Sequence, residues 1–262
     1  MAEIIAIANQ KGGVAKTTTS LNLAYSLMKL GKKVLMIDFD GQANLTTCFG
    51  IEEPNAIETN IAHLMIAKMN EEDIPDKSKY ILSNNGIDLI PSSIYLSVVD
   101  ANLRLEMGSE RILFEILEPL KADYDYIIID TSPSLGSLTI NALSAADSVI
   151  ITVNPQLLAM MGLQDFLKTT KKIQKRINSR LSIKGILLTM CDSRTNLSKV
   201  LSEQMSDAYD GVVNIFETHI PMTVKVGEAI YYSKSIAEYS PTSKAGIAYF
   251  DFAKEMLAYE ER

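Results

Sequence analysis

The sequence predicts an α/β fold, a doubly wound and mostly parallel sheet with helices on both faces. Two observations predict it: short apolar runs alternate with longer segments of helical periodicity, and no internal repeat interrupts the alternation. Such an alternation joins parallel strands through crossover helices. The 262 residues, 47% of them apolar, can bury a large core, so a single domain over residues 1–262 is expected.

Each element is expected where a run of the matching pattern occurs. Apolar runs rich in β-branched residues predict strands at residues 4–8, 33–37, 87–90, 126–129, 148–153, 183–190 and 212–220. Amphipathic runs predict helices at residues 17–30, 110–117, 137–145, 162–178, 197–208 and 244–259. Polar and turn-forming residues fill residues 70–86, which are therefore expected to form a surface insertion.

The segment between the first predicted strand and the first predicted helix has the pattern of a phosphate-binding loop. Residues 11–18 read Lys-Gly-Gly-Val-Ala-Lys-Thr-Thr. A glycine-rich turn that opens a helix directs several backbone N–H groups and the positive end of the helix dipole at one point. Lys16 would then reach the β- and γ-phosphates of a nucleotide, and Thr17 would hold Mg²⁺. The alternative is a glycine turn before a helix that begins with Lys-Thr by chance.

This loop departs from the general pattern G-x-x-x-x-G-K-[ST], because Gln10 and Ala15 stand at its glycine positions. The methyl group of Ala15 is expected to crowd the approach of the backbone to phosphate and to weaken nucleotide binding. A second lysine, Lys11, lies five residues before Lys16. Two ammonium groups so close repel each other unless both face several negative charges. Lys11 could also reach a nucleotide in a neighbouring subunit.

Two of the predicted strands end in carboxylates. Asp38 and Asp40 follow residues 33–37, and Asp130 follows residues 126–129. In open α/β sheets ligands bind at the carboxyl ends of the strands. Carboxylates there can orient the water ligands of Mg²⁺ or an attacking water. Taken alone, Asp38 and Asp40 could be two acidic residues in a turn. Any buried strand followed by Asp would also give the same pattern as Asp130.

Together these segments resemble the ParA/MinD family, and within it the short ParA-type (Soj-like) partition ATPases. Residues 11–17 are similar to the deviant P-loop K-G-G-x-G-K-[ST] of that family, with Ala15 in place of its last glycine. Residues 38–44 resemble D-x-D-P-Q-G-N, with Gly41 in place of proline and Ala43 in place of glycine. Asp130 resembles the Walker B acid.

The second half of the chain extends the resemblance, which runs from about residue 4 to residue 255. Residues 220–229 and 239–243 resemble the terminal I-P-R-N-V-R-L-S-E-A and Y-x-P-x-S stretch of the family. Met222 and Lys225 replace the two arginines of that stretch. Residues 186–196 are similar to the family's strand-to-loop segment near the adenine and the DNA-binding face.

The resemblance implies ATP and Mg²⁺ as cofactors and assigns roles to individual residues. Asp40 would position the hydrolytic water, and Lys11 would cross a dimer interface to the partner's ATP; with Lys16 they form the implied catalytic set. Contact with the nucleotide is implied for Lys11, Gly12, Gly13, Val14, Ala15, Lys16, Thr17, Thr18, Met190, Asp192 and Pro221. The implied metal-binding residues are Thr17, Asp38 and Asp130, the last through water.

The implied function is a partitioning ATPase that segregates plasmid or chromosomal DNA. Such a protein forms a nucleotide-sandwich homodimer, binds double-stranded DNA without sequence preference, and is stimulated by a ParB-like centromere-binding protein. Slow basal hydrolysis is expected, because Asp40 would orient water without a strong base nearby. The implied location is the cytoplasm, on the nucleoid when ATP is bound.

The formal charge of −7 excludes a chain that coats nucleic acid with its whole surface, but it allows a local basic patch. By resemblance, Arg194 and Lys225 are the candidates for DNA phosphate contact. Residues 168–184 also hold seven basic and no acidic side chains. That run is at least as compatible with an ordinary solvated helix face.

Several other classes are disfavoured by the residues. No apolar stretch is long enough to span a membrane, no signal segment is evident at the amino end, and the two cysteines lack a C-x-x-C spacing, so a cytosolic protein is expected. A MinD-like membrane ATPase would end in a basic amphipathic helix, whereas residues 250–262 end with net negative charge. A nucleotide-binding scaffold with little turnover remains an alternative function, because Ala15, Gly41 and Ala43 depart from the family patterns in the active loops.

Overall fold

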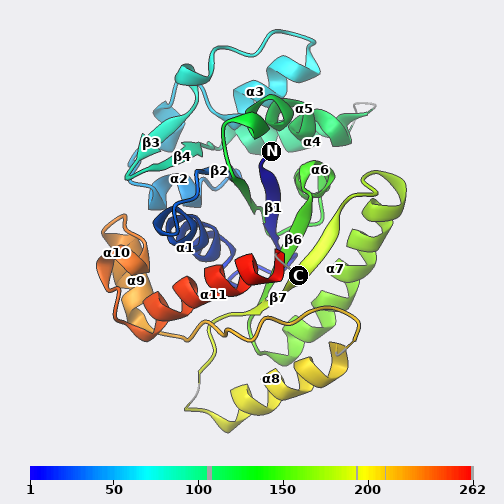
Figure 1. Ribbon diagram of the computed structural model, residues 1–262. Helices are drawn as coiled ribbons and strands as arrows, with labels where there is room; N and C mark the ends of the chain where they lie inside the picture. Colours follow the sequence, from blue (N-terminus) through cyan, green and yellow to red (C-terminus); the bar gives the residue numbers. More distant parts are fainter. Residues whose placement is uncertain (105–107, 193, 210, 261–262) are drawn as a thin grey trace.

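The computed structural model describes residues 1–104, 108–192, 194–209 and 211–260. Its centre is one seven-stranded sheet in the order β3-β4-β2-β5-β1-β6-β7, and every pairing is parallel except that of β3 with β4 (Figure 1). The strands are β1 (Glu3–Ala8), β2 (Val34–Phe39), β3 (Leu82–Asn84), β4 (Ile87–Ile90), β5 (Tyr126–Thr131), β6 (Ser148–Val153) and β7 (Ser182–Leu188). The predicted doubly wound fold class is confirmed.

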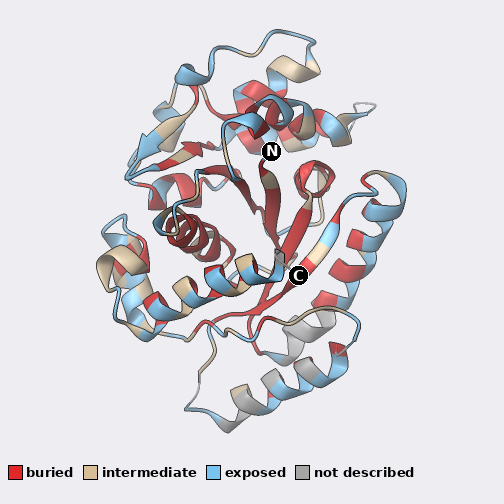
Figure 2. Ribbon diagram, viewed as in Figure 1, coloured by how far each residue is buried: buried red, intermediate tan, exposed pale blue. Residues whose placement is uncertain are grey.

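Helices cover both faces of the sheet, and each face has its own apolar core. One core includes buried residues of α3 (Ile61–Met69), α4 (Tyr95–Leu103), α5 (Ile112–Leu117), α6 (Ser137–Ala145), α7 (Leu157–Arg176) and α8 (Asn196–Tyr209). The other includes buried residues of α1 (Lys16–Lys29), α2 (Asn44–Cys48), α9 (Val224–Tyr231), α10 (Ile236–Tyr239) and α11 (Lys244–Glu260). Figure 2 shows the central strands buried between these two layers.

The register of the central strands brings the predicted site together. Asp38 of β2 pairs with Asp130 of β5, and Ile7 of β1 pairs with the same Asp130. Because these three neighbouring strands run parallel, their carboxyl ends open at one edge of the sheet. The loop after β1 and the acidic ends of β2 and β5 therefore converge there.

One predicted strand is wrong. Residues 212–220 form no continuous strand; their β structure is an isolated bridge between Ile215 and Ile186 of β7. Further backbone bonds still hold the segment against β7, since Ile220 donates to the Leu188 carbonyl at 2.9 Å. Gly185 permits this close approach, because a Cβ there would lie 2.7 Å from the Phe216 ring. The apolar pattern located two residues that are buried, Phe216 and Ile220, but not the irregular path of the segment.

Several short elements were not predicted. The helices α2, α3, α4, α9 and α10 are four to nine residues long, too short for a clear 3.6-residue period. Residues 70–86 contain a 3₁₀ turn (Lys77–Lys79) and strand β3, which forms an antiparallel edge hairpin with β4. No helix in the described part of the chain is long and apolar enough to cross a membrane.

Candidate nucleotide site

The loop between β1 and α1 is held by its own side chains. Asn9 accepts a hydrogen bond from the backbone N–H of Lys11 at 2.9 Å and donates one to the Thr152 carbonyl at 2.8 Å. Gln10 donates to the carbonyl of Gly162 at 2.7 Å, which ties the loop to α7. Gln10, which stands at the first glycine position of the general pattern, therefore links the loop to α7.

Helix α1 begins without a side-chain cap and without an acidic residue in its first turn. The positive end of this helix is therefore open to an anion from outside the chain. The residue before the helix, Ala15, has φ 60° and ψ 32°, the left-handed conformation that favours glycine. The alanine keeps the backbone shape of the pattern at a cost in strain.

Lys16 is the cation at the centre of the site. Its side chain is buried, and its ammonium group donates to the Lys11 carbonyl at 3.2 Å. Burial lowers the pKa of Lys16, while the carboxylates of Asp130 and Asp40 oppose that shift. A buried lysine at an uncapped helix end is suited to receive phosphate oxygens.

Asp130 is fully buried and has one unused oxygen. Its Oδ1 accepts from the Ser20 hydroxyl at 3.0 Å, whereas Oδ2 has no hydrogen-bond partner among the described residues. Burial and the nearby charge of Asp38 raise the pKa of Asp130 to about 7, against the Thr17 and Ser20 hydroxyls and the Lys16 ammonium. An orphaned carboxylate oxygen beside a threonine hydroxyl fits Mg²⁺, whose retained water ligands need such an acceptor.

Asp38 uses its carboxylate to hold the neighbouring backbone. Its Oδ2 accepts from both the backbone N–H and the hydroxyl of Thr46, at 2.8 and 2.7 Å, and its Oδ1 accepts from the Asp40 N–H at 3.3 Å. Burial raises the pKa of Asp38 to about 7, and these hydrogen bonds, which act in the opposite direction, offset only part of the rise. Asp38 therefore fixes the start of α2 and the position of Asp40.

A short hydrogen-bond chain anchors Asp40 from the other side. The Ser92 hydroxyl donates to the Asp40 carbonyl at 2.8 Å, and the Ser92 N–H donates to the Thr46 hydroxyl at 2.9 Å. Gly41, which replaces the family proline, lies against α4, and a Cβ there would collide with the hydroxyl of Ser97. Glycine at this position leaves room for the close approach of α4.

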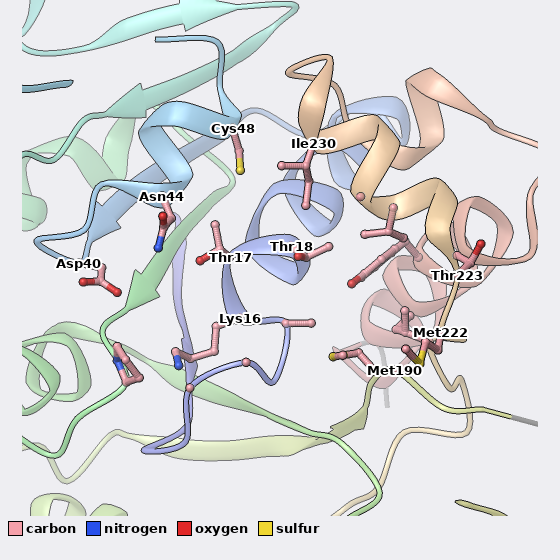
Figure 3. A pocket seen from close by; sticks show the side chains of 18 of the residues that line it. Lys16, Thr17, Thr18, Asp40, Asn44, Cys48, Met190, Met222, Thr223 and Ile230 are labelled. Carbon is pink, nitrogen blue, oxygen red and sulfur yellow. The ribbon is translucent and has the colours of Figure 1, made fainter. Parts of the chain in front are cut away.

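A cavity of about 560 Å³ opens over these residues. The predicted residues that line it are Gly12, Gly13, Ala15, Lys16, Thr17, Thr18, Asp40, Met190 and Pro221. Figure 3 shows Lys16, Asp40 and Asn44 on one side of the pocket and Met190, Met222 and Thr223 on the other, with Thr17 and Thr18 between. The cavity has a charged half and an apolar half, as a nucleoside phosphate requires.

The apolar half contains residues that sequence analysis missed. They are Ile220, Met222, Thr223, Val226, Gly227, Ile230 and Tyr249. The backbone N–H of Cys191 donates to the Ile220 carbonyl at 2.9 Å and that of Met222 donates to the Cys191 carbonyl at 3.0 Å, which brings residues 220–222 beside Met190.

The charged half also gains Asn44, Thr131 and Pro133, which adjoin motif residues and could have been found from that adjacency. Nothing local in the sequence marks Tyr249 or Ile230.

Other predicted site residues do not line the cavity. Val14, Asp38 and Asp130 are buried and do not line it. Asp192, also predicted to contact the nucleotide, is paired with Arg194 and does not line it either. Lys11 is half-buried, and its ammonium group donates to the Gln156 side-chain oxygen at 3.0 Å. That partner is a neutral amide, and Lys11 forms no ion pair with a carboxylate in the described part of the chain.

The two predicted DNA contacts are both engaged within the chain. Arg194 contacts Asp192 through two 2.9 Å bonds, and this pairing lowers the pKa of Asp192 to about 2. Lys225 contacts Glu228 at 2.8 Å and lies 5.7 Å from the centre of the Tyr239 ring. Both cations are on the surface, so a phosphate would have to displace these partners.

The basic run at residues 168–184 is not one continuous patch. Lys171, Lys172, Lys175 and Arg176 are exposed on α7, whereas Lys184 is buried and bonded to Glu3 at 2.7 Å. Lys184 therefore serves the core of the fold.

The fold and the site together define a P-loop nucleoside triphosphatase. Residues 2–183 match the AAA domain family. The sporulation initiation inhibitor protein Soj of Bacillus subtilis is 42% identical over 98% of this chain and 99% of its own length. The chromosome partitioning protein ParA of Myxococcus xanthus is 36% identical over 97% of this chain and 87% of its own. The chain belongs to the Soj/ParA family of partitioning ATPases.

Solved structures agree with the fold. The cobyrinic acid a,c-diamide synthase of Mycobacterium smegmatis, with bound ADP and magnesium, has a TM-score of 0.85 and 32% identity, over 100% of this chain and 96% of that one. The apo structure of Cyanothece McdA has the same TM-score and 26% identity, over 98% and 100% of the two chains. The former protein is also solved with an ATP analogue and magnesium. These are the cofactors predicted from the sequence.

Proposed function

We propose that this protein binds Mg·ATP in the cavity above Lys16, pairs with a second copy across the bound nucleotide, and binds DNA without sequence preference as a pair. Hydrolysis then dissolves the pair, slowly alone and faster with a ParB-like partner. The segregated cargo would be plasmid or chromosomal DNA. The relative ParA of Myxococcus xanthus is named as a chromosome partitioning protein, which supports this assignment.

The observation that carries the proposal is that the two lysines of the motif, Lys16 and Lys11, occupy different environments. Lys16 is buried, lines its own cavity and is attracted by the carboxylates of Asp130 and Asp40, so it would hold phosphate oxygens there. Lys11 has no part in lining that cavity, and its ammonium group donates to a neutral amide. A half-buried ammonium group at the edge of an anion site is available for a phosphate bound by another copy.

Bound Mg²⁺ would supply positive charge against the phosphates. Thr17 would offer its hydroxyl to the ion, and the free Oδ2 of Asp130 would accept from a water beside it. Asp40 would hold the attacking water, because its backbone is fixed by Asp38 and Ser92 while its side chain faces the cavity. No strong base adjoins Asp40 among the described residues of the cavity, so a slow basal rate is expected.

DNA binding would depend on the pair because each copy offers only weak contacts. Arg194 and Lys225 are exposed but partnered by Asp192 and Glu228, so each phosphate contact competes with an existing ion pair. Two copies double the number of contacts, and electrostatic affinity accumulates steeply with that number.

A scaffold with little turnover remains the second candidate, and one observation favours it. Ala15 and Ala43 both sit in the left-handed region, and the Ala15 methyl lines the cavity. A MinD-like membrane role has less support: Tyr249, Phe252, Ala253 and Met256 of α11 are buried in the core, so its apolar face is occupied.

Single-turnover hydrolysis of radiolabelled ATP separates the two candidates. The ATPase proposal expects one ATP consumed per chain, acceleration by DNA with the partner, and loss of cleavage but not of ATP binding in Asp40→Ala. Lys79→Ala, at an exposed lysine outside the cavity, should behave as wild type. If the wild-type protein leaves its bound ATP intact, the ATPase proposal is wrong and the scaffold is the remaining candidate.

A further inference from the structure

A second polar cavity, of about 280 Å³, lies between α5, α6 and the segment after α7. Its lining is Arg111, Phe114, Ser144, Ile177, Asn178, Ser179 and Arg180. It adjoins Leu181, just before β7 begins at Ser182, so it lies at the amino end of that strand. The nucleotide cavity lies at the carboxyl ends of the strands. We infer that this second cavity binds a phosphate group between Arg111 and Arg180, and we refer to it as the two-arginine cavity.

Both arginines lie over the same aromatic ring. The guanidinium carbons of Arg111 and Arg180 are 5.1 and 5.8 Å from the centre of the Phe114 ring. Neither forms an ion pair with a carboxylate in the described part of the chain. The ring attracts each cation but leaves its N–H groups without an acidic partner. Two such guanidinium groups around one hollow are suited to a doubly charged oxyanion.

The backbone that carries Arg180 is fixed before any ligand arrives. The amide of Asn178 donates to the carbonyls of Leu143 and Ala146, at 3.0 and 2.7 Å, and its oxygen accepts from the Arg180 N–H at 3.2 Å. Asn178 thus ties the loop to the end of α6. Because these bonds are already formed, little ordering entropy opposes ligand binding there.

The opposite wall is fixed in a similar way. The N–H of Leu113 donates to the Asn141 side chain at 3.2 Å, which joins the start of α5 to α6 close to Arg111. Ser144, on α6, borders the cavity and has a buried hydroxyl without a hydrogen-bond partner among the described residues. A small shift toward a bound oxyanion would satisfy that hydroxyl.

The size and charge of the cavity select among anions. About 280 Å³ is small for a whole nucleotide but ample for a phosphate group. The phosphate could be free in solution or part of a DNA backbone; the recognition chemistry is the same.

Calorimetric titration with inorganic phosphate tests the inference. The protein is first saturated with Mg²⁺ and a non-hydrolysable ATP analogue, so that the loop before α1 is filled. Saturable binding is expected, and Arg111→Gln or Arg180→Gln should weaken it roughly tenfold or more, because each removes one charge-assisted hydrogen-bonding group. Lys172→Gln, on the exposed side of α7 and outside the cavity, is the matched control and should bind as wild type.

A second arm uses a short DNA duplex in place of phosphate. If only the duplex binds, and both arginine variants weaken it while Lys172→Gln does not, the phosphate belongs to DNA. Equal binding by wild type and both arginine variants in both arms, or no binding in either, overturns the inference.

A measurement on the wild-type protein removes dependence on variants that could fail to fold. Phenylglyoxal modification, mapped by mass spectrometry without nucleotide, should be slowed at Arg111 and Arg180 by phosphate but not by chloride at equal ionic strength. Unchanged rates at both arginines would contradict the inference. Because this readout needs no ATP, it is independent of the proposed partitioning activity.

Discussion

The ammonium group of Lys16 donates a 3.2 Å hydrogen bond to the backbone carbonyl of Lys11. The two lysines of the motif are thus linked through the main chain of one and the side chain of the other. Phosphate binding would replace the carbonyl with charged oxygens, a stronger acceptor for a buried ammonium group. Because Lys11 belongs to the same loop, the release of its carbonyl from Lys16 would also affect the position of the Lys11 side chain.

Replacing Lys16 by methionine is expected to abolish most ATP affinity. Methionine keeps the length and apolar stem of the side chain but removes the buried charge, so a loss of about 30- to 100-fold is expected, equivalent to about 2–3 kcal/mol. Titration calorimetry with Mg·ATP measures it. Lys79→Met, at an exposed position outside the cavity, should bind with wild-type affinity. Equal affinities of the two variants would remove Lys16 from the site.

Ala43→Gly is expected to stabilise the protein by about 1 kcal/mol, because Ala43 has φ 51° and a left-handed alanine is strained. The change in midpoint of urea unfolding measures it. Ala24→Gly, inside α1, is the opposite control and should destabilise, since its backbone is helical and its methyl is buried. A destabilised Ala43→Gly protein would show that the methyl contributes more through packing than it costs in strain.

Ser92→Ala is expected to lower the hydrolysis rate at saturating ATP and to leave ATP affinity nearly unchanged. The Ser92 hydroxyl bonds to the Asp40 carbonyl and does not line the cavity, so its removal loosens only the residue that would hold water. A reduction of about five- to tenfold corresponds to one net hydrogen bond. Ser93→Ala is matched: it is buried and adjacent, but accepts from Asn60. If both variants slow hydrolysis alike, the effect is general and not due to the Asp40 carbonyl.

The free energy of unfolding of the ligand-free protein should fall as pH rises from about 4 to about 7. Folding raises the pKa of Asp38 and Asp130 from 3.8 to about 7, so the folded state binds more protons than the unfolded state in this range. Stability contributed by the neutral acids is complete below pH 4 and lost above pH 7. Urea unfolding at pH 5 and pH 7.5 checks the direction.

Asp130→Asn isolates one of the two acids, because asparagine cannot ionise. Its stability relative to wild type should be higher at pH 7.5 than at pH 5. A pH dependence identical to that of wild type would mean that Asp130 does not titrate in this range.

Asp192→Asn should strengthen DNA binding by the ATP-bound protein, because it releases Arg194 from its carboxylate partner. Arg194→Gln should weaken binding and lower the magnitude of the salt slope by about one for each phosphate that the arginine no longer neutralises. Fluorescence anisotropy over a range of salt concentrations measures both. No response in either variant would exclude Arg194 from the DNA interface.

The sequence predicted the parts of the site that lie close together along the chain. The loop, Lys16 and the acids at two strand ends were found because glycine, charge and strand periodicity are local signals. The apolar wall was found only at Met190 and Pro221, through family resemblance. Tyr249 and Ile230 reach the cavity from helices near the end of the chain, and only tertiary packing brings them there.

The two-arginine cavity shows the same limit. Arg111 and Arg180 are far apart in sequence, and each is an ordinary surface residue in its own segment. Their shared contact with Phe114 follows from how α5 packs beside α6 and the loop after α7. No spacing rule could have paired them.

Analytical sedimentation with Mg·ATP, with Mg·ADP and without nucleotide tests the central claim, that the Lys11 side chain serves the phosphates of a second copy. We expect the wild-type protein and Asp40→Ala to sediment as dimers with ATP alone, and Lys11→Ala to stay monomeric while still binding ATP. A Lys11→Ala protein that dimerises with ATP as readily as wild type would contradict the account.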